Sequence, residues 1–343
     1  MLTRRRASVL RLIIDEYIMT ATPVPSEALA HKYALGVSPA TVRNDMATLE
    51  DGGYISRRHI SGGGIPTDQG YRYYVESLMR EEDVPVDERL MVSHLFFLVE
   101  RELEEWNRLA AALLARTLNS VAIVSFPKAA RTRLKHIELV ALQELLALLV
   151  VVLRGTRLRR QLIAFDEAVT QDELNAISNR LNALCEGMTR PQIVACADRL
   201  SSQEGGIARA VVQVMEKEDA LRYGELCVEG VRHILGQPEF SGGEKTMALL
   251  DLLEGGRLVT SILPETVAPD GVQVIIGSEN REDAMRECSV VLAGYGVPDE
   301  VGGALAVLGP TRMPYDRAVS RVRFIGSLMS DLIGQLYRER RPG

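Results

Sequence analysis

The residues from Ser38 to Gly53, SPATVRNDMATLEDGG, carry the clearest structural signal in this chain. A serine followed by a proline is a favoured helix start, because the hydroxyl caps the helix and the first turn does not need the N–H that proline lacks. Apolar side chains then recur at helical spacing, at Val42, Met46 and Leu49, before a glycine pair. The pattern predicts an amphipathic helix that the glycine pair ends.

Two helices precede this segment and a wing follows it. Residues 4–20 place apolar side chains at helical spacing, and residues 26–33 predict a second short helix with a glycine turn after it. Residues 54–58 are typical of a strand, the glycine run at 61–64 of a loop tip, and Thr67 of the cap of a fourth helix. This order of elements predicts a winged helix-turn-helix.

The remainder of the chain predicts an α+β protein of several domains. A long amphipathic helix is expected over residues 88–118, a helical stretch over 171–253 and a closing helix over 314–338. Strand-like segments lie at 120–126, 134–142, 145–153, 158–165, 272–276, 289–293 and 305–308.

Strands followed by helices and then by strands indicate a sheet domain that a helical insertion interrupts. We therefore expect a winged-helix DNA-binding domain at 1–80, a linker at 81–87, a sheet domain at 88–168 and 255–343, and a mainly helical inserted domain at 169–254. The apolar stripes of the insertion are either a dimer interface or part of the core of their own domain.

Composition supports a folded protein with an uneven charge. The chain has 343 residues, of which 46% are hydrophobic and 25% charged, and its net charge is −6. These values suit two or three globular domains and exclude a disordered chain. Residues 1–80 hold 10 basic and 8 acidic side chains, whereas the rest hold 30 and 38. A slightly basic head on an acidic body fits a DNA-binding module joined to a regulatory domain.

The sequence favours neither an enzyme nor a metal protein. Its four cysteines form no CxxC pair, and its five histidines never approach the spacing of metal ligands. No nucleophile elbow or phosphate loop is present. The longest apolar run, residues 145–153, is about half of what a membrane helix needs. Because Arg11, Asp15 and Glu16 interrupt any leader-like segment, we expect a cytoplasmic protein with no membrane partner. Since no cofactor motif is visible, we also expect no cofactor.

The predicted third helix is the candidate DNA-reading element, because the first residues of the second helix of a helix-turn-helix enter the major groove. Ala40 and Asn44 lie opposite its core stripe, with Thr41 and Arg43 on the flanks. Small residues let the backbone approach the duplex, Asn44 matches the adenine edge, and Arg43 suits guanine or a phosphate. Solvated side chains are the alternative. With three residues before the wing loop added, the candidate DNA-binding residues are Ser38, Ala40, Thr41, Arg43, Asn44, Arg57, Arg58 and His59.

Several segments resemble HrcA, the bacterial heat-inducible transcription repressor family. Residues 36–50 resemble its recognition-helix segment, and residues 65–72 resemble the motif that follows its wing. Further similar segments are 228–230, 237–240, 275–280 and 309–313, so that the similarity spans nearly the whole chain in order.

The resemblance implies a homodimeric repressor of chaperone operons that binds an inverted-repeat operator in double-stranded DNA. It also implies a GAF-like sheet domain with an inserted dimerisation domain, and dependence on a GroE-type chaperonin for active folding. Heat shock would then derepress the chaperone genes when unfolded proteins occupy the chaperonin. In one departure, Gly64 stands where family members usually carry arginine, so that Arg57 or Arg58 would make the wing contact.

Two other classes of function fit part of the sequence. One is a winged-helix regulator that responds to a small molecule, with the GAF-like domain as effector sensor. The other is a nucleic-acid-modifying or nucleotide-modifying enzyme with an appended winged helix, for which the sequence offers no reactive cluster.

Overall fold

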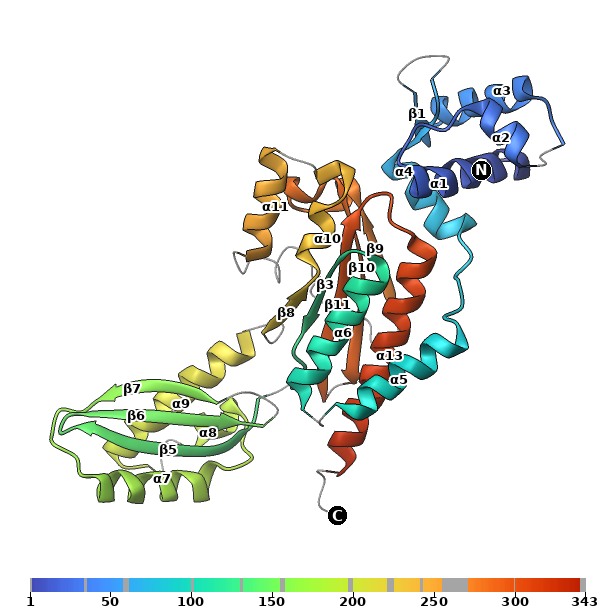
Figure 1. Cartoon of the computed structure of the whole chain (residues 1–343). Helices are drawn as coiled ribbons and strands as arrows, with labels where there is room; N and C mark the ends of the chain where they lie inside the picture. The colour runs from blue at the N-terminus through green and yellow to red at the C-terminus, as the bar shows by residue number, and fades with distance from the viewer. Residues whose placement is uncertain are drawn as a thin grey trace. The chain divides into compact units, whose positions relative to one another are not determined.

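The computed structural model describes a mixed α/β chain (Figure 1). The described residues are 2–33, 36–57, 62–99, 102–129, 132–154, 158–196, 200–220, 225–240, 243–254, 271–298 and 300–339. The chain divides into two compact units, unit 1 (residues 1–126, 225–295 and 304–343) and unit 2 (residues 127–224 and 296–303). Within the described ranges, no helix is both long and apolar enough to cross a bilayer.

The first part of unit 1, hereafter the head, has the order of elements that the sequence predicted. Its strands β1 and β2 pair antiparallel. The elements are α1 (Arg4–Thr20), α2 (Ser26–Lys32), α3 (Pro39–Asp51), β1 (Ile55–Ser56), β2 (Ile65–Pro66), α4 (Asp68–Tyr73) and a single π-helical turn, η1 (Tyr74–Leu78).

The core of the head forms between α1, α2 and α3. Val42, Met46 and Leu49 of α3 are at most 1% exposed, as the helical spacing predicted. They share the interior with Leu29 of α2 and with apolar residues of α1. The helix α3 begins as expected, because the Ser38 hydroxyl accepts a hydrogen bond from the Thr41 N–H at 3.2 Å.

The rest of unit 1, hereafter the sheet body, is built on an antiparallel sheet. Figure 1 shows α6 and α13 side by side against it. The strands, in spatial order, are β8 (Leu226–Glu229), β3 (Val121–Ser125), β11 (Val301–Pro310), β10 (Cys288–Val297) and β9 (Val272–Ile276). The helices are α5 (Val86–Leu98), α6 (Leu103–Leu118), α10 (Val231–Leu235), η3 (Pro238–Phe240), α11 (Glu244–Glu254), η4 (Gly277–Glu279), η5 (Asp283–Met285) and α13 (Tyr315–Glu339).

Unit 2 is a three-stranded antiparallel sheet with helices on one face. Figure 1 shows α8 and α9 behind the strands. The core of unit 2 lies between the sheet and these helices, with Leu149, Leu181 and Val211 at most 1% exposed. The elements are β4 (Lys128–Ala129), which pairs with the start of β11, β5 (Leu134–Gln143), β6 (Leu146–Leu153), β7 (Arg159–Ala164), α7 (Gln171–Cys185), α8 (Arg190–Ala195) and α9 (Ser202–Ala220).

The observed elements differ from the sequence prediction in three places. The expected helix over 88–118 is two helices, α5 and α6, and α5 already begins at Val86, inside the expected linker. Strand β8 lies in the stretch expected to be helical, where Ala122 of β3 pairs with Glu229. Strands β5–β7 group with helices α7–α9, and residues 225–254 group with the sheet body. Local patterns miss the second and third features because both depend on contacts between distant segments.

Candidate nucleic-acid interface

The outer face of α3 presents small and polar side chains above the buried stripe. Ala40, Arg43 and Asn44 are exposed, and Thr41 is half-buried on the flank. The Ser38 and Thr41 hydroxyls lie 3.0 Å apart and hydrogen-bond to each other at the start of the helix. The structure therefore brings the five predicted α3 residues to one surface, where a backbone with small side chains can approach a groove edge.

The two long polar side chains on this face are available to a partner. Among the residues that the structure describes, none accepts from or donates to the Asn44 amide group. The Arg43 Nη2 atom lies 3.5 Å from Glu27 Oε1, and the two side chains are 56% and 70% exposed. An ion pair between exposed groups is weak, so a phosphate or a guanine edge can replace Glu27 at little cost.

An ion pair between a half-exposed arginine and a buried carboxylate on the inner side of α3 holds the helix in place. Asp45 is 1% exposed, and both of its carboxylate oxygens accept from Arg5, at 2.6 and 3.0 Å. Arg6 Nε lies 3.5 Å from the same carboxylate. The hydrogen bonds from Arg5 lower the pKa of Asp45. Arg5 and Arg6 thus anchor α3. The sequence did not predict this role, although an acidic residue beside the apolar stripe was visible.

The three predicted wing residues are only partly placed. Arg57 Nε donates to Glu50 Oε2 at 2.8 Å, and the arginine side chain is 7% exposed. This contact holds Arg57 against the end of α3 and leaves its guanidinium little surface for DNA. Arg58 and His59 lie outside the described residues.

The departure at Gly64 has a packing reason. Gly64 is buried, and its N–H and carbonyl pair with Val24 at 2.9 and 3.0 Å. A Cβ atom here would lie 3.0 Å from Met46 Cε and 3.2 Å from Ile55 Cδ1. A Cβ on the neighbouring Gly63 would lie 2.5 Å from the Pro23 backbone. The glycines therefore let the base of the wing pack closely against the head, and a side chain at position 64 would require Met46 or Ile55 to move by a few tenths of an ångström.

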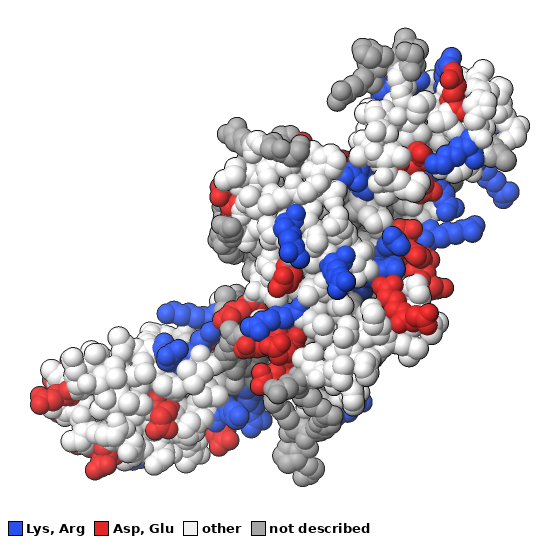
Figure 2. Space-filling model, in the orientation of Figure 1, with Lys and Arg blue, Asp and Glu red and all other residues white. Residues whose placement is uncertain are grey.

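The charge around the interface is mixed. Over the head, Figure 2 shows basic and acidic side chains interspersed on the face in view. Binding to DNA that depends on few cations gains less from counterion release than binding by a basic groove. Specific contacts to base edges then make a larger part of the affinity.

A helical trio with a hairpin wing, joined to a larger α/β body, is the architecture of winged-helix transcription regulators. A family model for the C-terminal domain of the HrcA protein matches residues 104–319. The chain belongs to the HrcA family of heat-inducible transcription repressors.

Curated relatives carry this membership, and a solved structure shares the fold. The heat-inducible transcription repressor HrcA of Herpetosiphon aurantiacus is 42% identical over 99% of this chain and 98% of its own length. The HrcA repressor of Dehalococcoides mccartyi strain 195 is 41% identical over 98% of this chain and 97% of its own length. The crystal structure of a hypothetical protein shares the fold, with a TM-score of 0.63 and 22% identity over 98% of this chain and 99% of that one. The relatives are named as repressors, and the chain is accordingly a heat-inducible repressor of transcription.

Proposed function

We propose that the chain acts as a homodimer that binds an inverted-repeat operator upstream of chaperone operons and blocks initiation there. The observation that carries this proposal is the outer face of α3, where Arg43 and Asn44 are exposed above a capped and anchored helix. Their donor and acceptor groups suit base edges in the major groove. Two such helices in a symmetric dimer match the two halves of a palindrome.

The open face of the unit 2 sheet, meaning the face away from α7–α9, supports a dimer. Val140 pairs with Leu148 across β5 and β6, and Leu148 pairs with Leu162 across β6 and β7. Val140 is 40% and Leu162 58% exposed, so aliphatic side chains form a row on this face. Exposed apolar patches of this kind mark protein interfaces. Unit 2 is thus our candidate for the inserted dimerisation domain, and a second copy of its sheet face is the proposed occupant.

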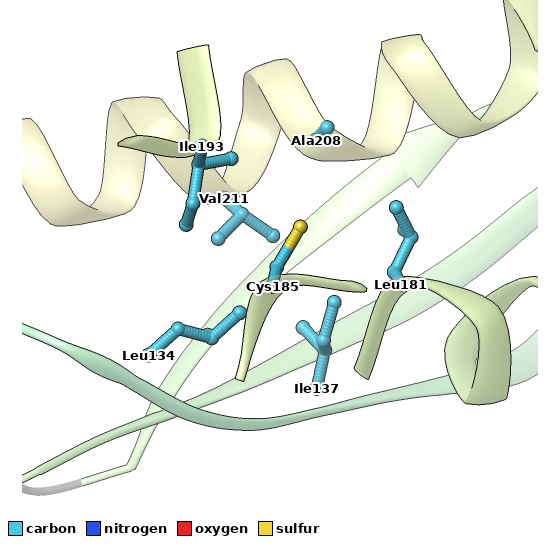
Figure 3. Close-up of a pocket in the computed structure, with 7 residues that line it drawn as sticks. All are labelled: Leu134, Ile137, Leu181, Cys185, Ile193, Ala208 and Val211. Atoms are coloured by element: carbon cyan, nitrogen blue, oxygen red, sulfur yellow. The ribbon is translucent and has the colours of Figure 1, made fainter. Parts of the chain in front are cut away.

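The helical stripes of the insertion have a different role in this proposal. Leu181, Ile193 and Val211 are buried in the core of unit 2, at most 2% exposed. Figure 3 shows the small apolar space that they enclose with Leu134, Ile137, Cys185 and Ala208. It leaves no room for a water-sized molecule. These residues serve the core of unit 2 in this proposal, and the sheet face serves the dimer.

The sheet body takes the place of the GAF-like domain in this proposal, with its antiparallel order β8-β3-β11-β10-β9 as support. We further propose that a GroE-type chaperonin helps the chain to fold. Distant pairing such as that of β3 with β8, about a hundred residues apart, slows folding and exposes apolar surface meanwhile. After heat shock, unfolded proteins would occupy the chaperonin, and inactive repressor would accumulate.

Footprinting on DNA upstream of the organism's own chaperone genes tests the proposal. The purified chain should protect a palindromic segment at moderate salt, and chaperonin should increase the fraction of protein that does so. A chain of verified fold that protects no palindrome would overturn the assignment of α3. A small molecule that changes protection at constant chaperonin would instead favour the effector-sensing regulator.

A further inference from the structure

Four segments that carry the family resemblance lie away from the outer face of α3, and the structure brings them together. Segment 65–72 belongs to the head, whereas 237–240, 275–280 and 309–313 belong to the sheet body. All of them lie within unit 1. Their contacts join the head to the sheet body, and we refer to this set of contacts as the junction.

The first contact of the junction joins the start of α4 to the loop after β9. The Ser278 N–H donates to the Asp68 carboxylate at 2.8 Å. The adjacent Gly277 has a φ of +50°, and a Cβ there would lie 2.3 to 2.4 Å from the Asp68 carboxylate atoms. The backbone angle and the close approach of Asp68 both exclude a side chain at position 277.

The second contact joins the last turn of α4 to the same loop. Arg72 Nε donates to Glu279 Oε1 at 2.8 Å, and a second guanidinium nitrogen donates to the other carboxylate oxygen and to the Val274 carbonyl, the latter at 2.8 Å. The Ile276 N–H also donates to Glu279, at 2.8 Å. Because its own loop holds the carboxylate, Glu279 offers Arg72 a fixed, bidentate partner.

The third contact lies at the end of α1. Arg312 binds Glu239 at 2.5 and 3.2 Å, and its Nη1 donates to the Ile18 carbonyl at 3.3 Å. A cation beside the last carbonyls of a helix is favourable. The rings of Tyr71 and Tyr315 pack between these polar contacts, with centroids 5.8 Å apart and both side chains buried.

The connection between head and sheet body also makes ion pairs with α13, of which one involves a buried arginine. Arg321 of α13, whose side chain is 7% exposed, pairs with Glu88 of α5 at 2.9 Å. Arg317 pairs with Glu82 at 3.1 Å, and Arg323 pairs with Glu81. The segment between head and sheet body is therefore held to α13 mainly by the Arg321–Glu88 pair, to which the two exposed pairs add little.

We propose that the junction holds α3 in one orientation on the sheet body, and that Asp68 and Arg72 are positioning residues that set which half-site spacing the dimer accepts. If the head could rotate on the sheet body at the junction, the distance and the angle between the two α3 helices of the dimer would vary as well. The inference rests on the proposed operator binding. In this inference, the outer face of α3 provides the affinity of the head for a half-site. The contacts of α4 at the junction provide the selectivity for the spacing between half-sites.

Operators with altered spacers test this role. The palindrome found by footprinting is lengthened between its halves by five base pairs, about half a helical turn, which moves one half-site to the opposite face of the duplex. The wild-type chain should lose about 100-fold in affinity, the loss expected when two sites cannot be engaged together. Glu279→Gln and Asp68→Asn should each reduce this penalty to about tenfold or less. Their affinity for a single half-site should equal that of the wild type.

Glu76→Gln is the matched control. Glu76 also faces Arg72, at 3.8 Å, but within the head, so its replacement removes the same charge without touching the junction. It should keep the wild-type spacer penalty. An unchanged penalty in both junction variants would overturn the inference, while a wild-type chain that ignores every palindrome would overturn the proposed function instead. If Asp68→Asn loses single half-site binding, Arg72→Gln takes its place in the comparison.

Discussion

The outer face of α3 and the open face of the unit 2 sheet are both exposed, yet they are built in opposite ways. On α3, the polar side chains of Arg43 and Asn44 stand on a helix that a cap and a buried carboxylate hold. On the sheet, Val140, Leu148 and Leu162 form an aliphatic row across three strands. A polar face stays hydrated at little cost until a matching partner arrives, whereas an apolar face is unfavourable as long as water covers it.

Because of this difference, we expect operator binding and dimerisation to depend differently on the salt concentration. Affinity that comes from side chains meeting bases and phosphates weakens as salt rises. Affinity between two aliphatic sheet faces depends on apolar area and is not weakened by screening. Operator binding should therefore be sensitive to salt at a protein concentration where the dimer is not.

The largest effect is expected from charging the sheet face. Leu162→Asp places a carboxylate within the aliphatic row of the proposed dimer interface, where burial of an unpaired charge is unfavourable. The variant should elute and scatter light as a monomer. Its operator affinity should fall about 100-fold or more, because the second half-site no longer binds intramolecularly.

Val194→Asp is the matched control for this variant. Val194 lies on α8 in the same unit and is 54% exposed, but it is on the helical side. The control should remain a dimer with wild-type affinity. A dimeric Leu162→Asp variant would show that the chains associate elsewhere.

The next effect is expected at the polar face. Asn44→Ala should weaken binding to each half-site by about 10- to 100-fold, since a bidentate base contact contributes about 1–3 kcal/mol. A filter-binding titration measures the loss, and light scattering should show an unchanged dimer. Asp51→Ala, at the far end of α3, should cause no loss. Wild-type affinity in Asn44→Ala would remove Asn44 from the interface.

The two faces also differ in what the sequence allowed us to predict. The bounds, cap and buried stripe of α3 follow from local features, because a helix periodicity of 3.6 is visible within a dozen residues. The sheet face was not predicted, because residues 145–153 are uninterruptedly apolar and such a run is typical of a strand buried on both sides. Only the register with β5 and β7 reveals that alternate side chains point outward.

Long-range contacts limited the rest of the prediction in the same way. Two arginines have structural partners that sequence spacing does not predict: Arg57 pairs with Glu50, and Arg5 pairs with Asp45. The segments at 65–72 and 275–280 were visible as family motifs, yet the contact of Asp68 with Ser278 joins residues 210 positions apart. Motifs therefore identified the segments, but only the fold shows which of them meet.

A smaller loss of operator affinity is expected for the two arginines near α3, and it should differ between them. Arg43→Ala should lower operator affinity about tenfold and reduce the slope of affinity against salt, by about one for each phosphate that the side chain no longer binds. Arg57→Ala should lower affinity less, because its side chain is 7% exposed and turned toward Glu50. Titrations at several salt concentrations measure both quantities. Equal losses in the two variants would contradict this ranking and place Arg57 on the DNA.

The smallest effect is expected on the anchor beneath the polar face. Pairing with Arg5 lowers the pKa of Asp45 in the folded head, so the unfolded chain binds a proton there first as the pH falls. The stabilisation from Asp45 is therefore complete above the ordinary carboxyl pKa of about 4, and it is lost as the pH falls through the lowered value. Hydrogen exchange of the α1 and α3 amides in the full chain measures this stabilisation.

Asp45→Asn should raise these exchange rates above pH 5 by less than about tenfold, because the Arg5 side chain is half exposed and water screens the pair. Below the lowered pKa, variant and wild type should exchange at the same rate. Asp51→Asn, on the exposed side of the same helix, should match the wild type at every pH. If Asp45→Asn also matched it at neutral pH, the polar face would not need its buried carboxylate, and the cap and apolar stripe alone would hold α3.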